Sequence, residues 1–466
     1  MARLKEYNGH YCESEYEYAF IGFLEAEGWK YSSGNNISRV TKRDVLIADD
    51  FKKFIADTNP DLTEDEVTQI YDNVRLVGAE SDFATLHKVY GWMVNGVQFT
   101  PQDGLPRMIP LIDFDNWDKN IFRVVNQFTV EYTNNGQKEN RRPDVLLFVN
   151  GMPLCVIELK NPADANATIY DAWEQINIRY WRDIPHLLHY CPLACISDGV
   201  KTRLGTVRTP YEHFYAWRRV NDGDVVSTLP FAETETMIKG VYSPERFLEI
   251  FRDYIYFQDS IYDSDEREIV CRYPQFFAAR LLKHSIIKSV VEKSGKGGTY
   301  FGATGCGKTY TMAFLARQLA LRCTDIPEIG SPTIILIVDR DELQKQGSKL
   351  FTKSKEFLNL GEVSVVKNRA QLRQELGARQ SGGFYICTIQ KFCDREDDKI
   401  GLINDRQNII CFSDEAHRTQ LEHSKKIQFS KDTDENMKAM VSKPYAKVLK
   451  EAFPHATFVG FTGTPI

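Results

Sequence analysis

The sequence predicts an α/β protein in two parts, a mixed α+β region followed by a lobe built on a parallel sheet. From Ser260 onward, helical stretches alternate with short apolar strands. This alternation is typical of parallel sheets, because each crossover between parallel strands takes a helix. Residues 1 to about 220 lack it, and 466 residues exceed what one hydrophobic core holds. The strands expected in the second part lie at residues 299–301, 333–338, 384–388, 409–413 and 457–461.

The first part begins with an expected helix from Ser14 to Gly28, followed by a small helical insertion. The insertion contains a capping-box pattern at Thr63-Glu64-Asp65-Glu66, which predicts a helix start. Residues 220–242 are polar and predict turns, and residues 243–257 predict an amphipathic helix. We therefore expect one domain at 1–225, a linker with a helix at 226–260, and a second domain at 261–466.

Composition excludes a protein that coats nucleic acid indiscriminately, because the net charge is −6 with 26% charged residues. Local basic clusters leave two interpretations open, namely solvated faces or contacts with DNA. These clusters lie at Arg141-Arg142, Arg179 to Arg182, Arg203 to Arg208 and Arg218-Arg219.

The ten cysteines are scattered, and several lie in apolar strands, which favours a reducing compartment such as the cytoplasm over a disulfide framework. The N-terminus lacks an export signal, and no run of about 18 apolar residues predicts a membrane span. A zinc site is not favoured, because its four candidate ligands lack paired C-x-x-C spacing. Those candidates are His186, His189, Cys191 and Cys195.

The stretch from Gly302 to Thr309 fits the phosphate-binding P-loop pattern. Glycines let backbone N–H groups turn toward phosphates, Lys308 is expected to reach the terminal phosphates, and the Thr309 hydroxyl is expected to bind Mg²⁺. An ordinary turn is the alternative for such an octapeptide. With the alternating strands, this motif predicts one RecA-like lobe that binds ATP. The expected nucleotide-binding residues of the loop are Thr304, Gly305, Cys306, Gly307, Lys308 and Thr309.

An Asp-Glu-Ala-His box, 414–417, follows an apolar run at 408–412 that predicts a buried parallel strand. Ligands bind at the C-terminal edge of such sheets. We therefore expect Asp414 to hold Mg²⁺ through its water shell and Glu415 to polarise the attacking water. An acidic pair after a strand is otherwise a solvated loop end, but the order of both motifs favours an ATP site.

A β-hairpin with acidic residues is predicted in the first part. The stretch from Arg142 to Val149 leads through Asn150-Gly151, a favoured tight-turn pair, into residues 152–156 and then Ile157-Glu158-Leu159-Lys160. Asp144 and Glu158 are expected to meet over a shared Mg²⁺, with Lys160 beside them to stabilise charge during phosphodiester hydrolysis. Surface ion pairs on a hairpin are the alternative. Glu158 lies in a strongly apolar stretch, however, where a carboxylate without a partner is costly.

Glu17, on the first helix, is a further candidate acid, with a solvent-facing glutamate as the alternative. At this point the residues resemble the restriction (R) subunit of type I restriction-modification enzymes over nearly the whole chain. Pro143-Asp144 and Glu158-Leu159-Lys160 are similar to that family's PD-(D/E)xK nuclease motif. The resemblance implies that Asp144 and Glu158 bind metal, that Lys160 is catalytic, and that Glu17 is the family's helical acid.

The family also carries a Gln-x-x-x-Tyr element, whereas Gln175 and Tyr180 here are separated by one extra residue, which leaves the register of Gln175 open. The second part resembles superfamily 2 helicase motors. The resemblance implies that Gln275 reads adenine, with a helix-start glutamine as the alternative. Residues 339–343, 388–390 and 462–465 resemble further motor motifs that grip DNA and couple hydrolysis to movement.

The resemblance implies a Mg²⁺- and ATP-dependent endonuclease and translocase acting on double-stranded DNA with methylase and specificity subunits. The family's second motor lobe does not follow within this sequence, so we expect a fragment deficient in ATPase activity and translocation. Two rivals stay open: a repair helicase with a nuclease-like DNA-binding domain, and a non-enzymatic scaffold gated by ATP.

Overall fold

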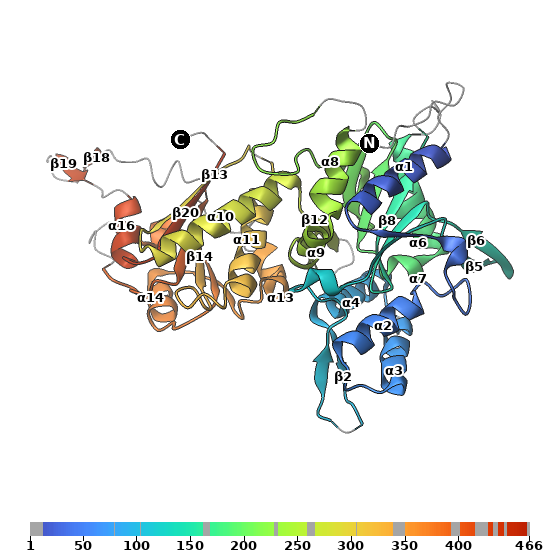
Figure 1. Ribbon diagram of the computed structural model, residues 1–466. Coiled ribbons are helices and arrows are strands. Elements are labelled where there is room, and N and C mark those ends of the chain that lie inside the picture. Colours follow the sequence, from blue (N-terminus) through green and yellow to red (C-terminus); the bar gives the residue numbers. More distant parts are fainter. Residues whose placement is uncertain are drawn as a thin grey trace. The chain divides into compact units, whose positions relative to one another are not determined.

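The computed structural model describes the chain in two compact units (Figure 1). One unit comprises residues up to 257 together with 261–273, and the other comprises 258–260 and the residues from 274 onward. The described residues are 13–78, 80–102, 104–161, 168–227, 232–258, 266–303, 305–338, 350–392, 401–414, 427–431, 437–441 and 445–463.

A six-stranded mixed sheet forms the centre of the first unit. β1 and β4 are parallel, β8 and β9 are parallel, and the other neighbours are antiparallel. The mixed α/β character expected from the sequence is thus confirmed. In spatial order the strands are β1 (Lys30–Ser33), β4 (Phe122–Asn126), β7 (Val145–Val149), β8 (Met152–Leu159), β9 (Leu193–Ser197) and β10 (Thr202–Thr206).

The hairpin β7–β8 lies in the middle of this sheet, and every residue of both strands is buried. Its turn is the predicted Asn150-Gly151 pair, with φ values of 50° and 77°. Such a turn needs φ > 0 at both central residues, which asparagine and glycine tolerate best. A Cβ atom on Gly151 would lie 2.2 Å from the carbonyl oxygen of Ile47, so only glycine fits there.

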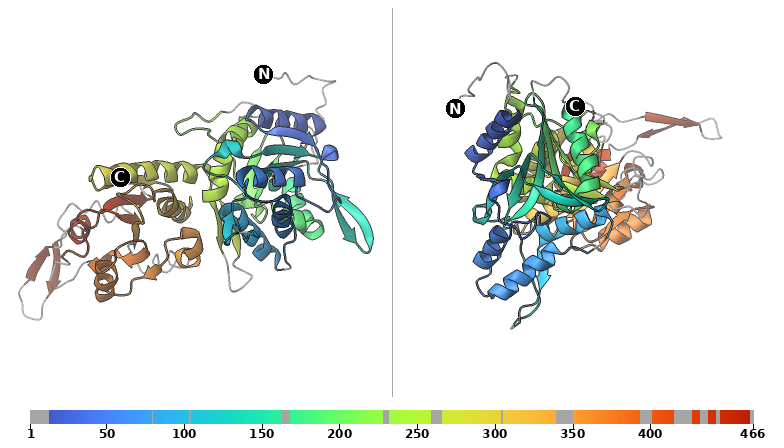
Figure 2. Two further views of the ribbon diagram at one scale, coloured as in Figure 1. Left: turned by 60° about the horizontal axis from the view of Figure 1, so that its bottom comes forward. Right: turned by 90° about the vertical axis from the view of Figure 1, so that its right-hand side faces the viewer.

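Helices cover both faces of the sheet. α1 (Glu13–Ala26) packs on β1 and β8, and Tyr16 Oη lies 2.7 Å from Ser197 Oγ, on the face shared by Leu159. α5 (Ile169–Glu174) packs on β8 and β9, and Figure 2 shows it on the side of the sheet opposite α1. Side chains on the two faces of β8 therefore meet different helices.

The helical insertion consists of three helices, α2 (Ala48–Thr58), α3 (Glu64–Arg75) and α4 (Asp82–Asn95). The predicted capping box is confirmed, since Thr63 Oγ1 accepts from the Glu66 N–H at 3.3 Å and Glu66 Oε2 accepts from the Thr63 N–H at 2.8 Å. The remaining strands here are β2 (Val97–Phe99), β3 (Arg107–Ile109), β5 (Val130–Asn134) and β6 (Gln137–Arg141), with 3₁₀ turns at Gly34–Asn36, Trp117–Lys119 and Tyr211–His213.

The turn-rich stretch expected at residues 220–242 is helical in its second half, whereas the amphipathic helix expected at 243–257 is present. α8 (Ala232–Met237) continues into a π-helical turn, η5 (Ile238–Tyr242), and α9 (Pro244–Asp253) follows. Phe247 and Phe251 of α9 are 0% exposed, so this helix belongs to the hydrophobic core of the first unit. β11 (Ile255–Gln258) then pairs with β12 (Arg267–Val270).

The second unit has a six-stranded sheet whose strands are all parallel, as predicted. In spatial order they are β13 (Lys296–Phe301), β20 (Thr457–Thr462), β17 (Ile409–Asp414), β14 (Thr333–Val338), β16 (Phe384–Thr388) and β15 (Val363–Val365). The helices are α10 (Tyr273–Val291), α11 (Lys308–Arg322), α13 (Lys355–Leu358), α14 (Arg369–Gly377) and α16 (Tyr445–Ala452), with a 3₁₀ turn at Ile389–Phe392 and a hairpin of β18 (Ile427–Lys431) and β19 (Met437–Val441).

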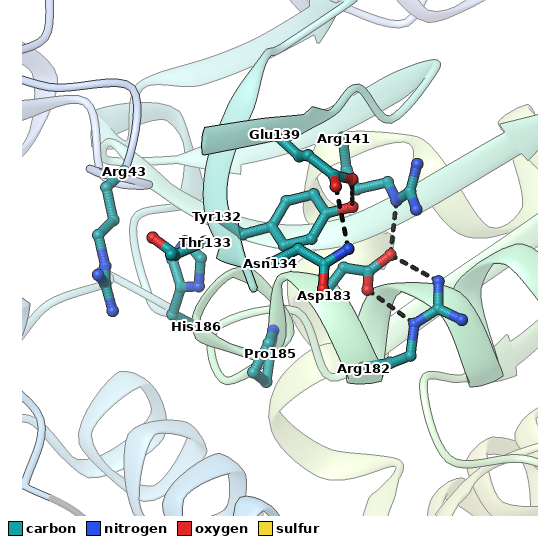
Figure 3. A pocket seen from close by; sticks show the side chains of 10 residues that line it. All are labelled: Arg43, Tyr132, Thr133, Asn134, Glu139, Arg141, Arg182, Asp183, Pro185 and His186. Atoms are coloured by element: carbon teal, nitrogen blue, oxygen red, sulfur yellow. Dashed lines mark hydrogen bonds and ion pairs between the residues drawn. The ribbon is translucent and has the colours of Figure 1, made fainter. Parts of the chain in front are cut away.

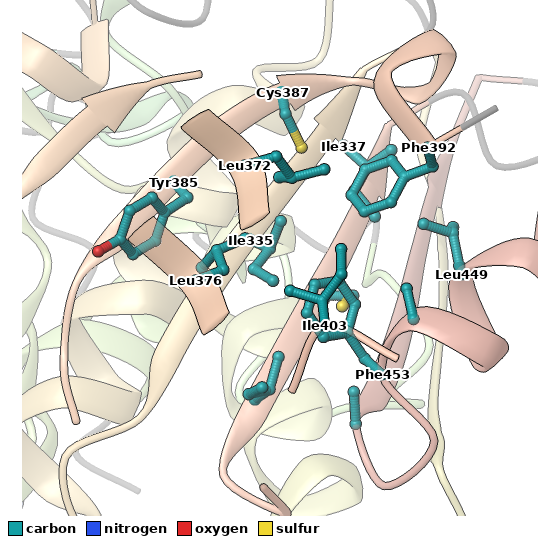
Figure 4. Close-up of a cluster of buried hydrophobic side chains, with 14 of the residues drawn as sticks. Ile335, Ile337, Leu372, Leu376, Tyr385, Cys387, Phe392, Ile403, Leu449 and Phe453 are labelled. Atoms are coloured by element: carbon teal, nitrogen blue, oxygen red, sulfur yellow. The ribbon is translucent and has the colours of Figure 1, made fainter. Parts of the chain in front are cut away.

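A cluster of buried apolar side chains holds one face of this sheet against α14 and α16 (Figure 4). Ile335 and Ile337 of β14 contribute from the sheet, and Leu372 and Leu449 contribute from the two helices. No described helix of either unit is both long and apolar enough to cross a membrane.

Candidate functional sites

The structure brings Asp144 and Glu158 together at the start of β7 and the end of β8. The Asp144 N–H donates to Glu158 Oε1 at 3.4 Å, and the Leu159 N–H donates to Asp144 Oδ2 at 2.8 Å. Antiparallel pairing of Val145 with Ile157 sets this juxtaposition, because the residues just outside that pair then lie opposite each other.

Glu158 is 0% exposed and has an incomplete set of partners. The Tyr180 hydroxyl donates to Oε1 at 2.6 Å, whereas Oε2 has no hydrogen bond within the described residues and lies 3.9 Å from Lys160 Nζ. Burial, and then the charge of Asp144, raise the pKa of Glu158 well above its usual range. Two adjacent carboxylates with one unsatisfied oxygen form a site that a divalent cation would stabilise.

Lys160 is connected to Glu158 through hydrogen bonds that run by way of Gln175 and Tyr180. Its Nζ donates to Gln175 Oε1 at 3.1 Å, and Gln175 Nε2 donates to Tyr180 Oη at 2.8 Å. Burial raises the pKa of Tyr180, so its hydroxyl stays protonated and can donate to Glu158. The cation, the amide, the phenol and the carboxylate therefore orient one another.

A π-helical segment, η3 (Gln175–Tyr180), explains how the extra residue is accommodated. π-helices have i→i+5 hydrogen bonds and arise where one residue is inserted into an α-helix. Residues five apart then lie on one face, and Gln175 and Tyr180 are hydrogen-bonded at that separation. Gln175 and Tyr180 are therefore paired in this chain, although they are separated by one residue more than in the Gln-x-x-x-Tyr element. Short helices, α6 (Trp181–Asp183) and α7 (Pro185–Leu188), follow.

Glu17 is 6% exposed, so the alternative of a solvent-facing glutamate is wrong. Its carboxylate accepts from Asn126 Nδ2 and Gln127 Nε2, each at 2.6 Å. The Gln127 N–H in turn donates to the carbonyl oxygen of Asp144 at 3.0 Å. Glu17 is therefore connected to the Asp144 backbone through a loop that the sequence analysis did not single out.

The donor set at Asp144 and Glu158 contains two carboxylates. Within the described residues no group of three or more His, Cys, Asp or Glu side chains gathers around a possible metal position. Mg²⁺ commonly keeps several waters and binds through one or two carboxylates, so two suffice for that ion. The unsatisfied Glu158 Oε2 indicates where part of its coordination would come from.

In the second unit, the P-loop follows β13 and leads into α11, as predicted. Gly305 and Gly307 have φ values of 81° and 84°, a conformation that favours glycine. The Cys306 N–H donates to the Ala303 carbonyl at 3.1 Å, and Lys308 Nζ folds back to the Gly302 carbonyl at 3.3 Å. Thr309 lies in the first turn of α11, and Thr304 lies outside the described residues.

Gln275 and Asp414 lie at the same end of the second unit. Gln275 is 3% exposed, and its Nε2 donates to the Gly307 carbonyl at 3.2 Å. Asp414 ends β17, and β20 lies between β17 and β13. The carboxyl ends of parallel strands share one edge of a sheet, so Asp414 and the P-loop lie on that edge. Glu415 and residues 339–343 lie outside the described residues.

Two protein families match different parts of the chain. Residues 11–213 match the family described as type I restriction enzyme R protein N terminus, and residues 274–466 match the SWI2/SNF2 ATPase family. A type I restriction enzyme HindI endonuclease subunit of Haemophilus influenzae is 31% identical over 97% of this chain and 42% of its own length. The chain belongs to the type I restriction enzyme R protein family.

Further relatives come from two other organisms. The putative MjaIXP endonuclease subunit of Methanocaldococcus jannaschii is 30% identical over 97% of this chain and 42% of its own length. The SauCOLORF180P endonuclease subunit of Staphylococcus aureus is 26% identical over 77% of this chain and 33% of its own length. The chain thus spans less than half the length of these relatives. Residues 214–273, which contain α8, α9 and β12, lie between the two family matches.

Proposed function

We propose that this chain carries the DNA-cleaving and ATP-binding parts of an ATP-dependent type I restriction endonuclease. The observation that carries the proposal is the contact of Asp144, Glu158 and Lys160 at the end of a buried hairpin. The names of the relatives, which describe endonuclease subunits of type I restriction enzymes, support the same activity.

In this proposal Asp144 and Glu158 hold Mg²⁺. Bound there, the ion would act as a Lewis acid toward the scissile phosphate and offset the charge of the two carboxylates. The fit rests on the unsatisfied Oε2 of the buried Glu158 and on the neighbouring Asp144. The first unit, which comprises residues up to 257 together with 261–273, then corresponds to a nuclease domain of the PD-(D/E)xK type.

Lys160 is proposed as the catalytic cation. Its Nζ lies 3.9 Å from Glu158 Oε2 and is anchored by Gln175, so it is positioned to donate to a phosphate oxygen as negative charge develops there. Tyr180 and Gln175 act as positioning residues, because they fix the rotamers of Glu158 and Lys160. Glu17 supports the loop before β7 through Gln127.

The second unit, which comprises residues 258–260 and those from 274 onward, is proposed to be a RecA-like lobe that binds Mg²⁺–ATP. The P-loop residues Gly305, Cys306 and Gly307, with Thr304, surround the phosphates. Lys308 contacts the terminal phosphates, Thr309 and Asp414 hold Mg²⁺, and Glu415 orients the water. Gln275 reads the adenine from its position against the P-loop.

ATP hydrolysis would drive translocation of double-stranded DNA before cleavage, with methylase and specificity subunits as partners. Because those steps belong to the whole protein, the test uses the complete R protein assembled with its partners. Supercoiled plasmid cleavage should be lost by at least about 100-fold with Lys160→Ala or Asp144→Asn. The exposed Lys138→Ala serves as the charge-matched control for Lys160→Ala.

Unchanged cleavage by both variants would refute the nuclease assignment and favour a repair helicase with a silent nuclease-like domain. The ATP assignment is tested separately by Lys308→Ala, which should abolish ATP hydrolysis without unfolding the first unit. A protein that cleaves normally after this change would contradict the proposed coupling of the two sites.

A further inference from the structure

A polar cavity of about 590 Å³ lies at the base of the β5–β6 hairpin, outside the site described above (Figure 3). It draws its walls from four parts of the first unit: the loop before α2, the hairpin, α6 and α7. The lining residues are Arg43, Tyr132, Thr133, Asn134, Glu139, Arg141, Arg182, Asp183, Pro185 and His186.

The cavity has an excess of positive charge. Its lining contains three guanidinium groups and two carboxylates. Hydrogen bonds from Tyr132 and Asn134 lower the pKa of Glu139, and the hydrogen bond from Arg182, the largest cause, lowers the pKa of Asp183. Both acids are therefore ionised at neutral pH, and the lining carries about one net positive charge.

The arginines keep donors for a further ligand. Arg141 Nε and Arg182 Nε donate to Asp183, each at 2.7 Å, which fixes both side chains in place. Within the described part of the chain, the two Nη groups of Arg141 and the guanidinium of Arg43 have no hydrogen bond or ion pair. A guanidinium with free Nη groups is well suited to phosphate oxygens.

His186 adds a buried polar atom without a partner. Its Nε2 atom is inaccessible to solvent and makes no hydrogen bond to any residue that the structure describes. Burial, followed by the charge of Arg43, lowers the pKa of His186 to about 4, so the ring is neutral at pH 7. The neutral ring therefore adds no positive charge to the cavity lining.

Two of the four cavity walls, β6 and α6, are joined to the proposed nuclease site by short stretches of chain. Arg141 ends β6 three residues before Asp144, and Asp183 follows three residues after Tyr180, which contacts Glu158. Three residues span at most about 10 Å, so the backbone of Arg141 and that of Asp183 each lie within about 10 Å of a residue of the nuclease site. Neighbouring phosphates of one DNA strand could therefore occupy the cavity and the nuclease site together.

We propose that the Arg43–Arg141–Arg182 cavity binds one backbone phosphate of the DNA strand that enters the nuclease site. The inference rests on the proposed nuclease function and adds to it the group that positions the substrate. Such a contact would set register and affinity without reading the base sequence, because it involves only the phosphate.

The test measures binding of a fluorescein-labelled duplex to the chain by anisotropy over a salt series, in EDTA so that no cleavage occurs. Each neutralised phosphate contributes about 0.9 to the slope of log K against log [salt]. Arg43→Ala/Arg182→Ala should lower the slope by about 0.9, and each single variant should lower it by no more. When the salt concentration rises from about 50 to 200 mM, both proteins lose affinity for DNA. The loss for the double variant should be about 3.5-fold smaller than the loss for the unchanged chain.

Lys138→Ala, on the same hairpin but outside the cavity lining, is the matched control and should leave the slope unchanged. A double variant with the unchanged slope, or a control with the same drop, would overturn the cavity assignment. A drop near about 1.8 would overturn the claim of a single phosphate. If one of these results is found and the unchanged enzyme still cleaves plasmid in a way that depends on Lys160, the cavity assignment fails and the nuclease proposal stands. The nuclease proposal itself fails if Lys160→Ala cleaves normally.

Discussion

Replacing Glu158 with glutamine should stabilise the metal-free first unit while abolishing DNA cleavage. The carboxylate is 0% exposed beside Asp144, and both factors raise its pKa. Glutamine has nearly the same shape, can still accept the Tyr180 hydrogen bond and carries no charge. The change therefore removes an electrostatic cost without creating a cavity.

The sign and size follow from proton linkage. A glutamate titrates near about 4.3 in the unfolded chain, and its raised pKa in the folded chain means that the folded state binds more protons above that pH. Below about pH 4 the variant should thus match the unchanged protein. As pH rises toward the folded pKa, the unchanged protein loses up to about 1.4 kcal/mol per pH unit relative to Glu158→Gln, which is about 3–5 °C in Tm.

Tryptophan fluorescence measures this directly, because all six tryptophans lie in the first unit. Thermal unfolding in EDTA is followed from pH 4 to 8 for the unchanged protein, for Glu158→Gln and for Glu139→Gln. The pKa of Glu139 is lowered, so its charge stabilises the folded state above about pH 4.3, and its variant should be less stable than the unchanged protein by a nearly constant amount across this pH range.

Mg²⁺ supplies a second arm of the experiment. At 100 times its Kd, the ion should stabilise the unchanged protein by about 2.7 kcal/mol. It should stabilise Glu158→Gln much less. The reasoning is that a buried charge at Glu158 destabilises the folded state until a cation binds. Two results would refute it: parallel plots of Tm against pH for Glu158→Gln and the unchanged protein, or equal stabilisation of both proteins by Mg²⁺.

Three further predictions concern the contacts around the two sites. Tyr180→Phe removes the hydrogen bond to Glu158 and should lower the cleavage rate of the assembled enzyme about 10-fold, with DNA affinity unchanged in the anisotropy assay. Deleting Ile178, which is 48% exposed, should convert the π-helix to an α-helix that still pairs Gln175 with Tyr180. Cleavage should then stay within about fivefold, and a loss as large as that of Lys160→Ala would contradict this explanation of the extra residue. Gly307→Ala would place a Cβ atom 2.4 Å from Gln275 Nε2 at a φ of 84°, so binding of a fluorescent ATP analogue should be lost, and retained affinity would argue against the P-loop geometry.

Local patterns in the sequence were enough to predict several features that the structure confirms. The Asn150-Gly151 turn, the capping box at Thr63 and the alternation of helices with parallel strands each depend on residues close together in the chain. Their energetics are local, because they follow from allowed dihedral angles, from hydrogen bonds within one turn or from the period of apolar residues.

The stretch expected to form turns at residues 220–242 is partly helical, because α8 and η5 occupy residues 232–242, whereas the amphipathic helix expected at 243–257 is present as α9. Phe247 and Phe251 become core residues through packing against other parts of the first unit. Intrinsic propensity is a weak guide in such a segment, since tertiary packing overrides it.

The sequence by itself thus determined which residue types are available at the two sites and in which order they occur. Only the tertiary structure decided that Gln175 pairs with Tyr180 across a π-helical turn, that Glu17 is buried against Asn126 and Gln127, and that arginines from three segments meet around one cavity. The physical reason is that the contacts of Glu17 and of the arginines depend on strand register and on packing between segments far apart in the chain, which no local pattern specifies. The Gln175–Tyr180 contact joins residues only five apart, and it depends on whether that turn is α-helical or π-helical.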